Sequence, residues 1–417
     1  MGGTADRARE LVGAVDVGTS SVRFYVFTCD TAAVVAYHQI PLNVLFPSHG
    51  WVEQDATEVL EKTCECIEQC SRKVELKGFS SRQIKAIGVT NQRETLVIWS
   101  KETGQPIRTA LVWSDNRTIQ LVNDIKATLP GGTDSSIRFK TGLHLSPYFT
   151  GPKFLWLYRN DDVVRNAVDN GTCLIGTMDS WIVYGLTGEH VTDVSNASRT
   201  LFFNICKLKY DHSLLQLFCV PPTILPTVKS SSEIYGKITS GALTGVPISG
   251  ILGDQQAALV GHLALQPGQC KTTYGTGCFL LCNIGSKPVF SDEGLLTTVA
   301  YQLGPDMPAR YAFEGAVAVA GAGINWLRDN LRIAKNAAEI ELLASQVTES
   351  NIDFVPAFSG LYCPYWEPRA SGIISGISYS TTNKHLARAA LEAGMRTVGL
   401  LVLFFIFFYF FSLLTCC

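Results

Sequence analysis

The sequence lacks an excess of charge of either sign. Its 34 Lys and Arg residues nearly balance 36 Asp and Glu residues, which leaves a formal net charge of −2 at pH 7. A protein that binds the phosphate backbone of nucleic acid needs a basic surface, and this composition does not supply one. We therefore exclude nucleic acid as a partner and expect a small-molecule ligand.

Three familiar signatures are also missing. The chain has no GxxxxGK[ST] phosphate loop, no CxxC pair or His cluster at zinc spacing, and no apolar signal segment at its beginning. Its 13 cysteines are an odd number, so they cannot all form disulfides within one chain. These absences favour a reducing, cytoplasmic compartment. We expect Cys64, Cys66 and Cys70 to be small buried thiols in a helix over residues 57–73.

The chain has enough length and apolar content for two domains, with 417 residues of which 47% are hydrophobic. Apolar runs at 11–15 and 22–27 flank a Gly-Thr-Ser-Ser turn and predict a hairpin. A second hairpin is predicted over 272–283, after a helix over 257–265. Two Gly-Thr hairpins in one chain suggest two related lobes that face one cleft, with a boundary near Gly250.

Polar residues that could contact a ligand are found in the two predicted turns and at the end of one predicted strand. Glycine lets a backbone approach a charged ligand closely, and turn N–H groups and hydroxyls donate to phosphate oxygens. Residues 91–94 place Asn, Gln, Arg and Glu in succession after an apolar strand. An Arg and a Glu side by side suit neighbouring hydroxyls of a polyol, which both donate and accept. Alone, most Gly-Thr hairpins are purely structural, and the Arg-Glu pair is equally compatible with a surface ion pair.

Several stretches together resemble the glycerol kinases of the FGGY carbohydrate kinase family. The matching segments are DVGTSSVR at 16–23, GWVEQD at 50–55, GVTNQRE at 88–94, DVSNASRT at 193–200, GDQQAA at 253–258 and YGTGCF at 274–279. The resemblance runs from about residue 10 to about residue 392 in order and spacing. It implies an α/β fold of the actin-like, ribonuclease H-like type with two lobes, ATP and Mg²⁺ as cofactors, and glycerol as substrate.

The resemblance also implies a role for individual residues. Asp254 matches the catalytic base, and Asp16 matches the carboxylate that faces the metal-bound phosphates. The implied glycerol shell consists of Arg93, Glu94, Trp113, Tyr148, Asp254, Gln255 and Phe279. The implied nucleotide contacts are Thr19, Ser20, Arg23, Thr276, Gly321 and Asn325. Four positions depart from the usual pattern of the family, namely Val17, Val22, Asn325 and Ser371. They put nucleotide affinity and acceptor preference in question, but none removes the base or the glycerol shell.

The end of the chain departs most from the family. The resemblance implies further helices and an Asp-Gly-Gly turn that hold adenine and ribose, whereas residues 398–414 read VGLLVLFFIFFYFFSLL without a charge. We expect a disordered N-terminus (1–10), a first lobe (11–250), a partial second lobe (251–393) and a divergent apolar tail (394–417). Two interpretations of the tail stay open: an end produced by splicing or read-through, or a membrane anchor.

Three functions follow from these patterns. The leading hypothesis is ATP-dependent phosphorylation of glycerol to sn-glycerol 3-phosphate, with Asp254 as base. A second is phosphorylation of a larger sugar, which the Arg-Glu and Tyr set disfavours. The third is a catalytically impaired, truncated form that binds glycerol or a partner, tethered to a membrane by residues 398–414. A homo-oligomer is compatible with each of them.

Overall fold

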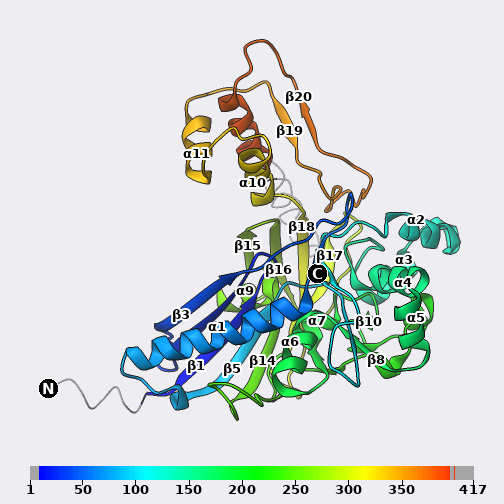
Figure 1. Cartoon of the computed structure of the whole chain (residues 1–417). Helices are drawn as coiled ribbons and strands as arrows, with labels where there is room; N and C mark the ends of the chain where they lie inside the picture. The colour runs from blue at the N-terminus through cyan, green and yellow to red at the C-terminus, as the bar shows by residue number, and fades with distance from the viewer. Residues whose placement is uncertain (1–8, 395–398, 400–417) are drawn as a thin grey trace. The chain divides into compact units, whose positions relative to one another are not determined.

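The computed structural model describes residues 9–394 and residue 399. By internal contacts the chain divides into two compact units, which we call unit 1 and unit 2. Figure 1 labels their helices and strands. Unit 1 consists of Met1–Ala257 and Thr298–Tyr311, and unit 2 of Ala258–Thr297 and Ala312–Cys417. The segment 298–311 therefore returns to unit 1 from further along the chain, whereas we expected one linear boundary near Gly250.

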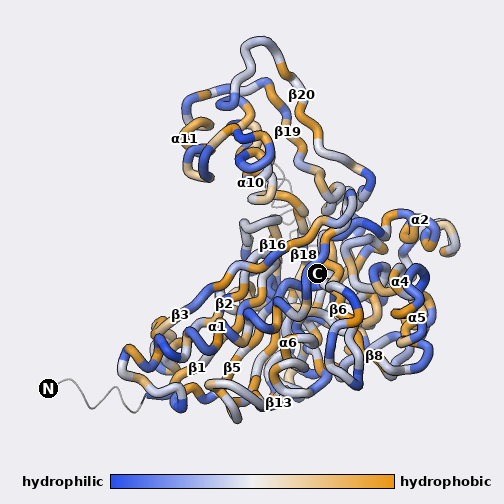
Figure 2. The backbone as a smooth tube through the Cα atoms, in the orientation of Figure 1, coloured by the Kyte–Doolittle hydropathy of each residue, from blue (hydrophilic) through white to orange (hydrophobic). Residues whose placement is uncertain are grey.

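A six-stranded sheet forms the centre of unit 1, in the order β13-β14-β5-β1-β2-β3. Strands β1, β2 and β3 pair antiparallel, while β1, β5 and β14 run parallel. The bounds are β1 (Leu11–Val17), β2 (Ser21–Thr28), β3 (Val34–Pro41), β5 (Ile84–Asn91), β13 (Gly236–Lys237) and β14 (Pro247–Gly253). Figure 2 shows apolar and polar stretches following one another along these strands. The first predicted hairpin is confirmed by the pairing of β1 with β2.

Helix α1 (Ala56–Leu76) packs its apolar face on β1, β2 and β3. Asp55 caps it by accepting a hydrogen bond from the backbone N–H of Thr57 at 2.8 Å. Cys66 and Cys70 are buried, as predicted, and burial raises the pKa of each thiol to about 11. Cys64 is exposed, so the prediction was wrong for this residue, which lies on the solvent face of the helix.

The rest of unit 1 consists of short two-stranded sheets and helices around the six-stranded sheet. The paired strands are β4 (Glu53–Gln54) with β7 (Ala110–Leu111), β6 (Val97–Ser100) with β8 (Cys173–Gly176), β9 (Val191–Asp193) with β12 (Thr227–Lys229), and β10 (Phe203–Asn204) with β11 (Lys209–Tyr210). The helices are η2 (Ser81–Gln83), α2 (Ile119–Thr128), η3 (Pro130–Gly132), α3 (Ser135–Thr141), α4 (Thr150–Asn160), α5 (Asp162–Asp169), α6 (Met178–Thr187), α7 (Val194–Ala197), α8 (His212–Leu217) and η4 (Pro222–Ile224).

A four-stranded sheet, in the order β15-β16-β18-β17, follows in the chain. Its strands are β15 (Cys270–Tyr274), β16 (Cys278–Gly285), β17 (Leu296–Tyr301) and β18 (Arg310–Val317). The second predicted hairpin is confirmed by the pairing of β15 with β16. The remaining elements are α9 (Asp254–Gly261), α10 (Gly321–Asp329), α11 (Ala337–Ser345), the pair β19 (Asp353–Val355) and β20 (Ile373–Ser375), and the helical residues 383–394.

The helix expected over 257–265 is α9, which begins three residues earlier and ends at Gly261. Its end is explained by Leu263, which adopts φ = 57°, a left-handed conformation that no helix continues through. The earlier start makes Asp254 the first residue of the helix. Acidic side chains are favoured at this position because the free N–H groups of the first turn carry partial positive charge.

Two predictions concern the ends of the chain. Residues 1–8 of the expected disordered N-terminus, and the apolar run at 398–414 apart from residue 399, lie outside the described residues. Among the residues that the structure does describe, no helix combines the length and the apolar character needed to cross a membrane.

Candidate active site

Predicted site residues of unit 1 lie together where three parallel strands end. In the register of the sheet, Val17 of β1 lies beside Asn91 of β5, and Asn91 lies beside Gly253 of β14. The chain leaves β5 into Arg93 and leaves β14 into Asp254, so both side chains emerge at the same edge. The carboxyl ends of parallel strands are where ligands bind in open α/β sheets.

Arg93 contacts several polar side chains at this edge of the sheet. Its side chain is almost fully buried, and its Nε lies 3.3 Å from Oδ1 of Asp254. Its two Nη atoms donate to Oε1 of Gln256 at 3.3 Å and to the hydroxyl of Tyr148 at 3.4 Å. A Cβ at Gly253 would lie 2.7 Å from Cδ of Arg93, so only glycine leaves room for this arrangement. The guanidinium is thus held in one orientation with the Asp254 carboxylate beside it.

Asp254 remains partly accessible although it lies beside a buried arginine. About a third of its side chain (34%) is exposed, and its carboxylate accepts hydrogen bonds from the backbone N–H of Gln255 at 2.8 Å and from Nε2 of that residue at 3.3 Å. Gln255 itself is buried. The carboxylate can therefore meet a ligand from solvent while its position is fixed by neighbours on the protein side.

Glu94 is held by an arginine to which the sequence analysis gave no role. Nε of Arg199 donates to Oε1 of Glu94 at 2.6 Å, and both side chains are buried. Glu94 adopts φ = 62°, and its carbonyl accepts a hydrogen bond from the hydroxyl of Thr150 at 3.1 Å. Arg199 belongs to the DVSNASRT stretch, which carried the family resemblance but gave no sign of where its arginine would point.

Trp113 and Tyr148 form an aromatic wall next to Arg93. Their rings lie edge to face with centroids 5.8 Å apart. The indole Nε1 of Trp113 donates to the hydroxyl of Thr19 at 2.9 Å, and that hydroxyl lies 3.4 Å from Oε1 of Gln92. Thr19, predicted as a phosphate contact, therefore joins the first hairpin to this wall.

Lys153 of α4 binds the backbone of the segments that carry Trp113 and Tyr148. We did not predict a role for this residue from the sequence. Its Nζ donates to the backbone carbonyls of Trp113 at 3.3 Å, Pro147 at 2.6 Å and Tyr148 at 2.8 Å. Burial lowers the pKa of this lysine to about 7, opposed by the nearby carboxylates of Asp115 and Glu94. Only the charged ammonium has three hydrogens for the three carbonyls. Lysine is usually a surface residue, so no sequence signal pointed to this position.

A buried polar network locks the strand ends together. Asn91 and Asn196 exchange side-chain hydrogen bonds at 3.0 and 3.2 Å, and the backbone N–H of Gly253 donates to Oγ of Ser195 at 3.0 Å. Asp193 caps α7 and accepts from Ser195 and from Ser231. Burial raises the pKa of Asp193. This network fixes the separation of β5 and β14, and with it that of Arg93 and Asp254.

Asp16 and Arg23 pair with each other across the first hairpin. They are register partners in β1 and β2, and Nη1 of Arg23 donates to Oδ2 of Asp16 at 2.8 Å. Each side chain is about one third exposed, and Ser20 in the turn is exposed. Among the described residues there is no group of three or more potential metal ligands. A single accessible carboxylate fits a magnesium ion, which keeps several waters and takes its other ligands from phosphates.

The predicted residues of unit 2 gather at the turn of the second hairpin. The backbone N–H groups of Ala320 and Ala322 donate to the carbonyl of Thr276 at 2.9 and 3.1 Å, and that of Gly321 donates to Gly275 at 2.9 Å. The first turn of α10 is thereby joined to the hairpin. Asn325 is exposed one turn further along α10, whereas Phe279 is buried in β16.

Packing within the chain requires glycine at Gly277 of this turn and at Gly321 of α10. A Cβ at Gly277 would lie 2.6 Å from the carbonyl oxygen of Val317, and one at Gly321 would lie 2.6 Å from that of Gly275. We expected the turn glycines to allow the approach of a ligand. For Gly277, the approach of one backbone segment to another already demands glycine, whereas a Cβ at Gly275 would meet only the carbonyl oxygen of Gly277 at 3.9 Å.

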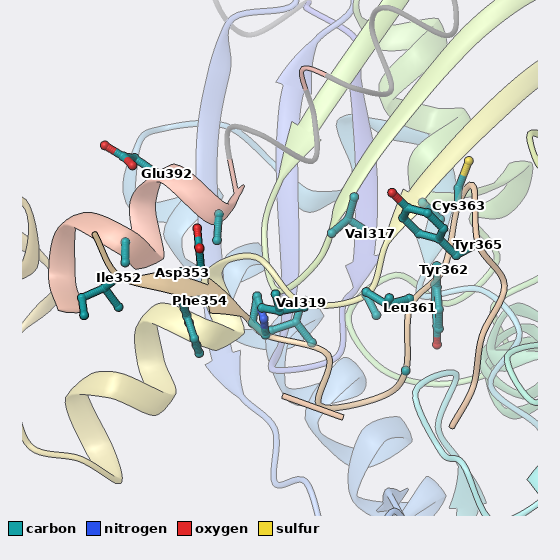
Figure 3. Close-up of a pocket in the computed structure, with 17 residues that line it drawn as sticks. Val317, Val319, Ile352, Asp353, Phe354, Leu361, Tyr362, Cys363, Tyr365 and Glu392 are labelled. Carbon is teal, nitrogen blue, oxygen red and sulfur yellow. The ribbon is translucent and has the colours of Figure 1, made fainter. Parts of the chain in front are cut away.

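Unit 2 also contains an apolar cavity of about 490 Å³. In Figure 3, Ile352 and Phe354 lie on one side of it and Leu361 and Tyr362 on the other, with Val319 between them. None of the predicted site residues is among those that line it. We therefore describe it as separate from the candidate active site.

Comparisons with known proteins agree with the geometry. The model of the FGGY family of carbohydrate kinases, N-terminal domain, matches residues 11–261, and that of the C-terminal domain matches residues 270–398. A probable glycerol kinase from Caenorhabditis elegans is 47% identical over 384 residues, which cover 92% of this chain and 76% of the relative. A glycerol kinase from Brucella anthropi is 46% identical over 390 residues, which cover 92% of this chain and 77% of that protein.

A solved structure supports the same assignment. The crystal structure of Plasmodium falciparum glycerol kinase with ADP superposes with a TM-score of 0.81 at 34% identity, covering 94% of this chain and 78% of that one. The predicted fold class is confirmed, because this architecture is the two-domain, actin-like α/β fold of these kinases. The chain therefore belongs to the FGGY family of carbohydrate kinases.

Proposed function

We propose that this chain is a glycerol kinase, an enzyme that transfers the γ-phosphoryl group of ATP to glycerol and releases sn-glycerol 3-phosphate and ADP. One observation carries the proposal: buried Arg93 is fixed between the hydroxyl of Tyr148 and the accessible carboxylate of Asp254. The similarity to glycerol kinases over most of the chain supports the same substrate.

Glycerol would bind against this arrangement by its three hydroxyls. We assign Arg93, Tyr148 and Gln255 as donors and the carboxylates of Glu94 and Asp254 as acceptors. Trp113 and Phe279 would pack against the carbon backbone. A molecule with one polar face and one apolar face is oriented by such a pair of surfaces.

Asp254 is the base in the proposed reaction. Its carboxylate takes the proton of a terminal glycerol hydroxyl while that oxygen forms a bond to the γ-phosphorus of ATP. The bond from the phosphorus to the bridging oxygen of ADP breaks, and ADP leaves with the electron pair. Arg93 keeps the carboxylate in place through the contact at 3.3 Å.

The nucleotide contacts and the metal ligand remain proposals from the family resemblance. We assign the phosphates of ATP to Thr19, Ser20, Arg23 and Thr276, and the rest of the nucleotide to Gly321 and Asn325. Asp16 would hold a magnesium ion through water, and this ion supplies charge neutralisation to the phosphates when bound. The pairing of Asp16 with Arg23 places a carboxylate and a phosphate donor side by side, which suits a magnesium–phosphate ligand.

The test is glycerol-dependent ADP formation by the full chain with Mg-ATP. Asp254→Asn keeps the shape and removes the base, so we expect a loss of at least about a hundredfold in kcat with little change in the KM for glycerol. Asp306→Asn, at an exposed position, makes the same change of charge and should leave both constants unchanged.

Two results would overturn the proposal. One is equal ADP formation with and without glycerol in the folded wild-type chain. The other is a higher kcat/KM for a five-carbon ketose than for glycerol, which would favour another substrate class of the same family.

A further inference from the structure

The second hairpin places two cysteines directly opposite each other. Cys270 opens β15, and its partner in the antiparallel register is Cys282 of β16. Cys278 lies on the same strand, four residues before Cys282, and is paired with Tyr274 instead. Among the described cysteines none is in a disulfide. The geometry of this pair is set by the hydrogen bonds on either side of it.

The pair occupies a non-hydrogen-bonded position of the ladder. The backbone N–H of Asn283 donates to the carbonyl of Gln269 at 2.9 Å, and that of Gly275 donates to Gly277 at 2.9 Å. Hydrogen-bonded and non-hydrogen-bonded pairs alternate along an antiparallel ladder, so the Cys270–Cys282 pair is of the second kind. Opposite Cα atoms at such positions are about 4.5 Å apart, which is within the range that a disulfide spans.

The two thiols differ in access and acidity. Cys270 is exposed, whereas Cys282 is only 3% exposed. Sγ of Cys270 donates to the carbonyl of Gly268 at 3.5 Å, and Sγ of Cys282 donates to that of Asn283 at 3.9 Å. The interaction between the two neighbouring thiols lowers the pKa of Cys270 and raises that of Cys282. The accessible sulfur is thus the one that more readily becomes a thiolate, and its partner lies within reach of it.

We propose that Cys270 and Cys282 form a reversible cross-strand disulfide when the protein meets a small-molecule disulfide such as oxidised glutathione. The thiolate of Cys270 attacks one sulfur of the oxidant, whose S–S bond breaks and releases one glutathione thiolate. Cys282 then loses its proton and attacks the sulfur of Cys270, which expels the second glutathione thiolate. The two glutathione thiolates gain the two protons lost by the cysteines, so one disulfide is reduced as another forms.

The cross-link would brace the hairpin that carries Thr276. The carbonyls of Gly275 and Thr276 accept three backbone hydrogen bonds from the start of α10, so the turn and the helix move together. A covalent bond at the open end of the two strands removes their freedom to separate. The modification site goes beyond the proposed function and does not depend on it.

Mass spectrometry of peptides tests the proposal. The full-length chain is incubated with millimolar oxidised glutathione and then digested without reduction. Cleavage after Lys271 separates Cys270 from the peptide that contains Cys278 and Cys282. We expect these two peptides to be joined, lighter than their sum by two hydrogen atoms, and to separate when dithiothreitol is added. The Cys278→Ser variant should keep the link, and Cys282→Ser should lose it.

Three outcomes would overturn it. They are free thiols at both positions under conditions that modify the other exposed cysteines, a stable glutathione adduct on Cys270, or a link that survives Cys282→Ser. If a variant fails to fold, fragmentation of the joined wild-type peptides shows whether Cys278 or Cys282 is linked to Cys270. Because the link is measured by mass, its absence says nothing about glycerol phosphorylation, and a lack of kinase activity says nothing about the link.

Discussion

Buried charges define the candidate site at the scale of single residues. Arg93 and Arg199 are almost fully inaccessible, and each lies beside a carboxylate, Asp254 at 3.3 Å and Glu94 at 2.6 Å. Burying a charge without a partner is strongly unfavourable, and removing one member of a buried pair leaves the other uncompensated. These pairs therefore add little net stability, but they allow charged groups to be held rigidly where a polyol would bind.

Lys153 allows a test of how the free energy of unfolding depends on pH. Its pKa is about 7 in the folded chain and about 10.4 in an unfolded one. Between these values unfolding takes up a proton, so this residue makes the free energy of unfolding rise with pH. Compared with Lys153→Met, the wild-type chain should gain about 2 kcal/mol between pH 7 and pH 9. Denaturant unfolding of both proteins at the two pH values measures the difference.

The control for this experiment is Lys85→Met, at an exposed lysine of β5, whose curve should run parallel to that of the wild type. A Lys153→Met curve that also runs parallel would contradict the prediction. It would mean that the three carbonyls keep the ammonium charged throughout this pH range.

At the scale of elements, the site depends on how strands end and helices begin. Strand β14 ends at Gly253 and α9 begins at Asp254, with no connecting residue. Asp254 therefore follows the strand end directly, and Arg93 passes over that end at a distance that excludes a Cβ at Gly253. The junction and the α7 network together set the position of the proposed base.

Gly253→Ala tests this junction. The added Cβ would lie 2.7 Å from Cδ of Arg93 and 2.9 Å from Oε1 of Gln256, so the guanidinium must shift. We expect the KM for glycerol to rise about tenfold or more, with a much smaller change in the KM for ATP. Steady-state kinetics with each substrate varied in turn measures both.

The matched control is Gly261→Ala at the other end of the same helix, where an added Cβ would meet nothing within 4 Å. This variant should leave both KM values unchanged. An unchanged KM for glycerol in Gly253→Ala would show that Arg93 does not contact the substrate.

At the scale of the whole molecule, the proposed glycerol residues other than Phe279 belong to unit 1, and the proposed nucleotide residues are divided between the units. Each unit has its own hydrophobic core. In unit 1 this core includes Val15, Phe24 and Ile87, and in unit 2 it includes Leu327, Ile340 and Phe354. We expect glycerol to stabilise mainly unit 1, whereas Mg-ATP would contact residues of both units.

Ligand-dependent unfolding tests this separation. Glycerol at about a hundred times its Kd should stabilise the full chain by about 2.7 kcal/mol, and Mg-ATP should add to this if the nucleotide residues also bind. Thermal unfolding with each ligand alone and with both measures the two effects. Arg93→Met should lose the response to glycerol and keep the response to Mg-ATP; loss of both would count against separate binding.

The sequence by itself determined the local features of this protein. Both hairpins and α1 could be predicted, because hydrophobic periodicity and turn residues act over a few neighbouring positions. Family motifs also indicated the base and the glycerol shell, although their roles stay proposals. The course of 298–311 back to unit 1 was not predictable, because it depends on contacts distant in sequence.

Only the tertiary structure decided which side chains meet. The partnership of Glu94 with Arg199, 105 positions apart, has no local signature. Lys153 looked ordinary until the fold placed three carbonyls around its ammonium group. The physical reason is the same for both. A charged side chain can be buried only where distant segments supply its partners, and sequence patterns predict which residues are buried better than they predict which residues form contacts.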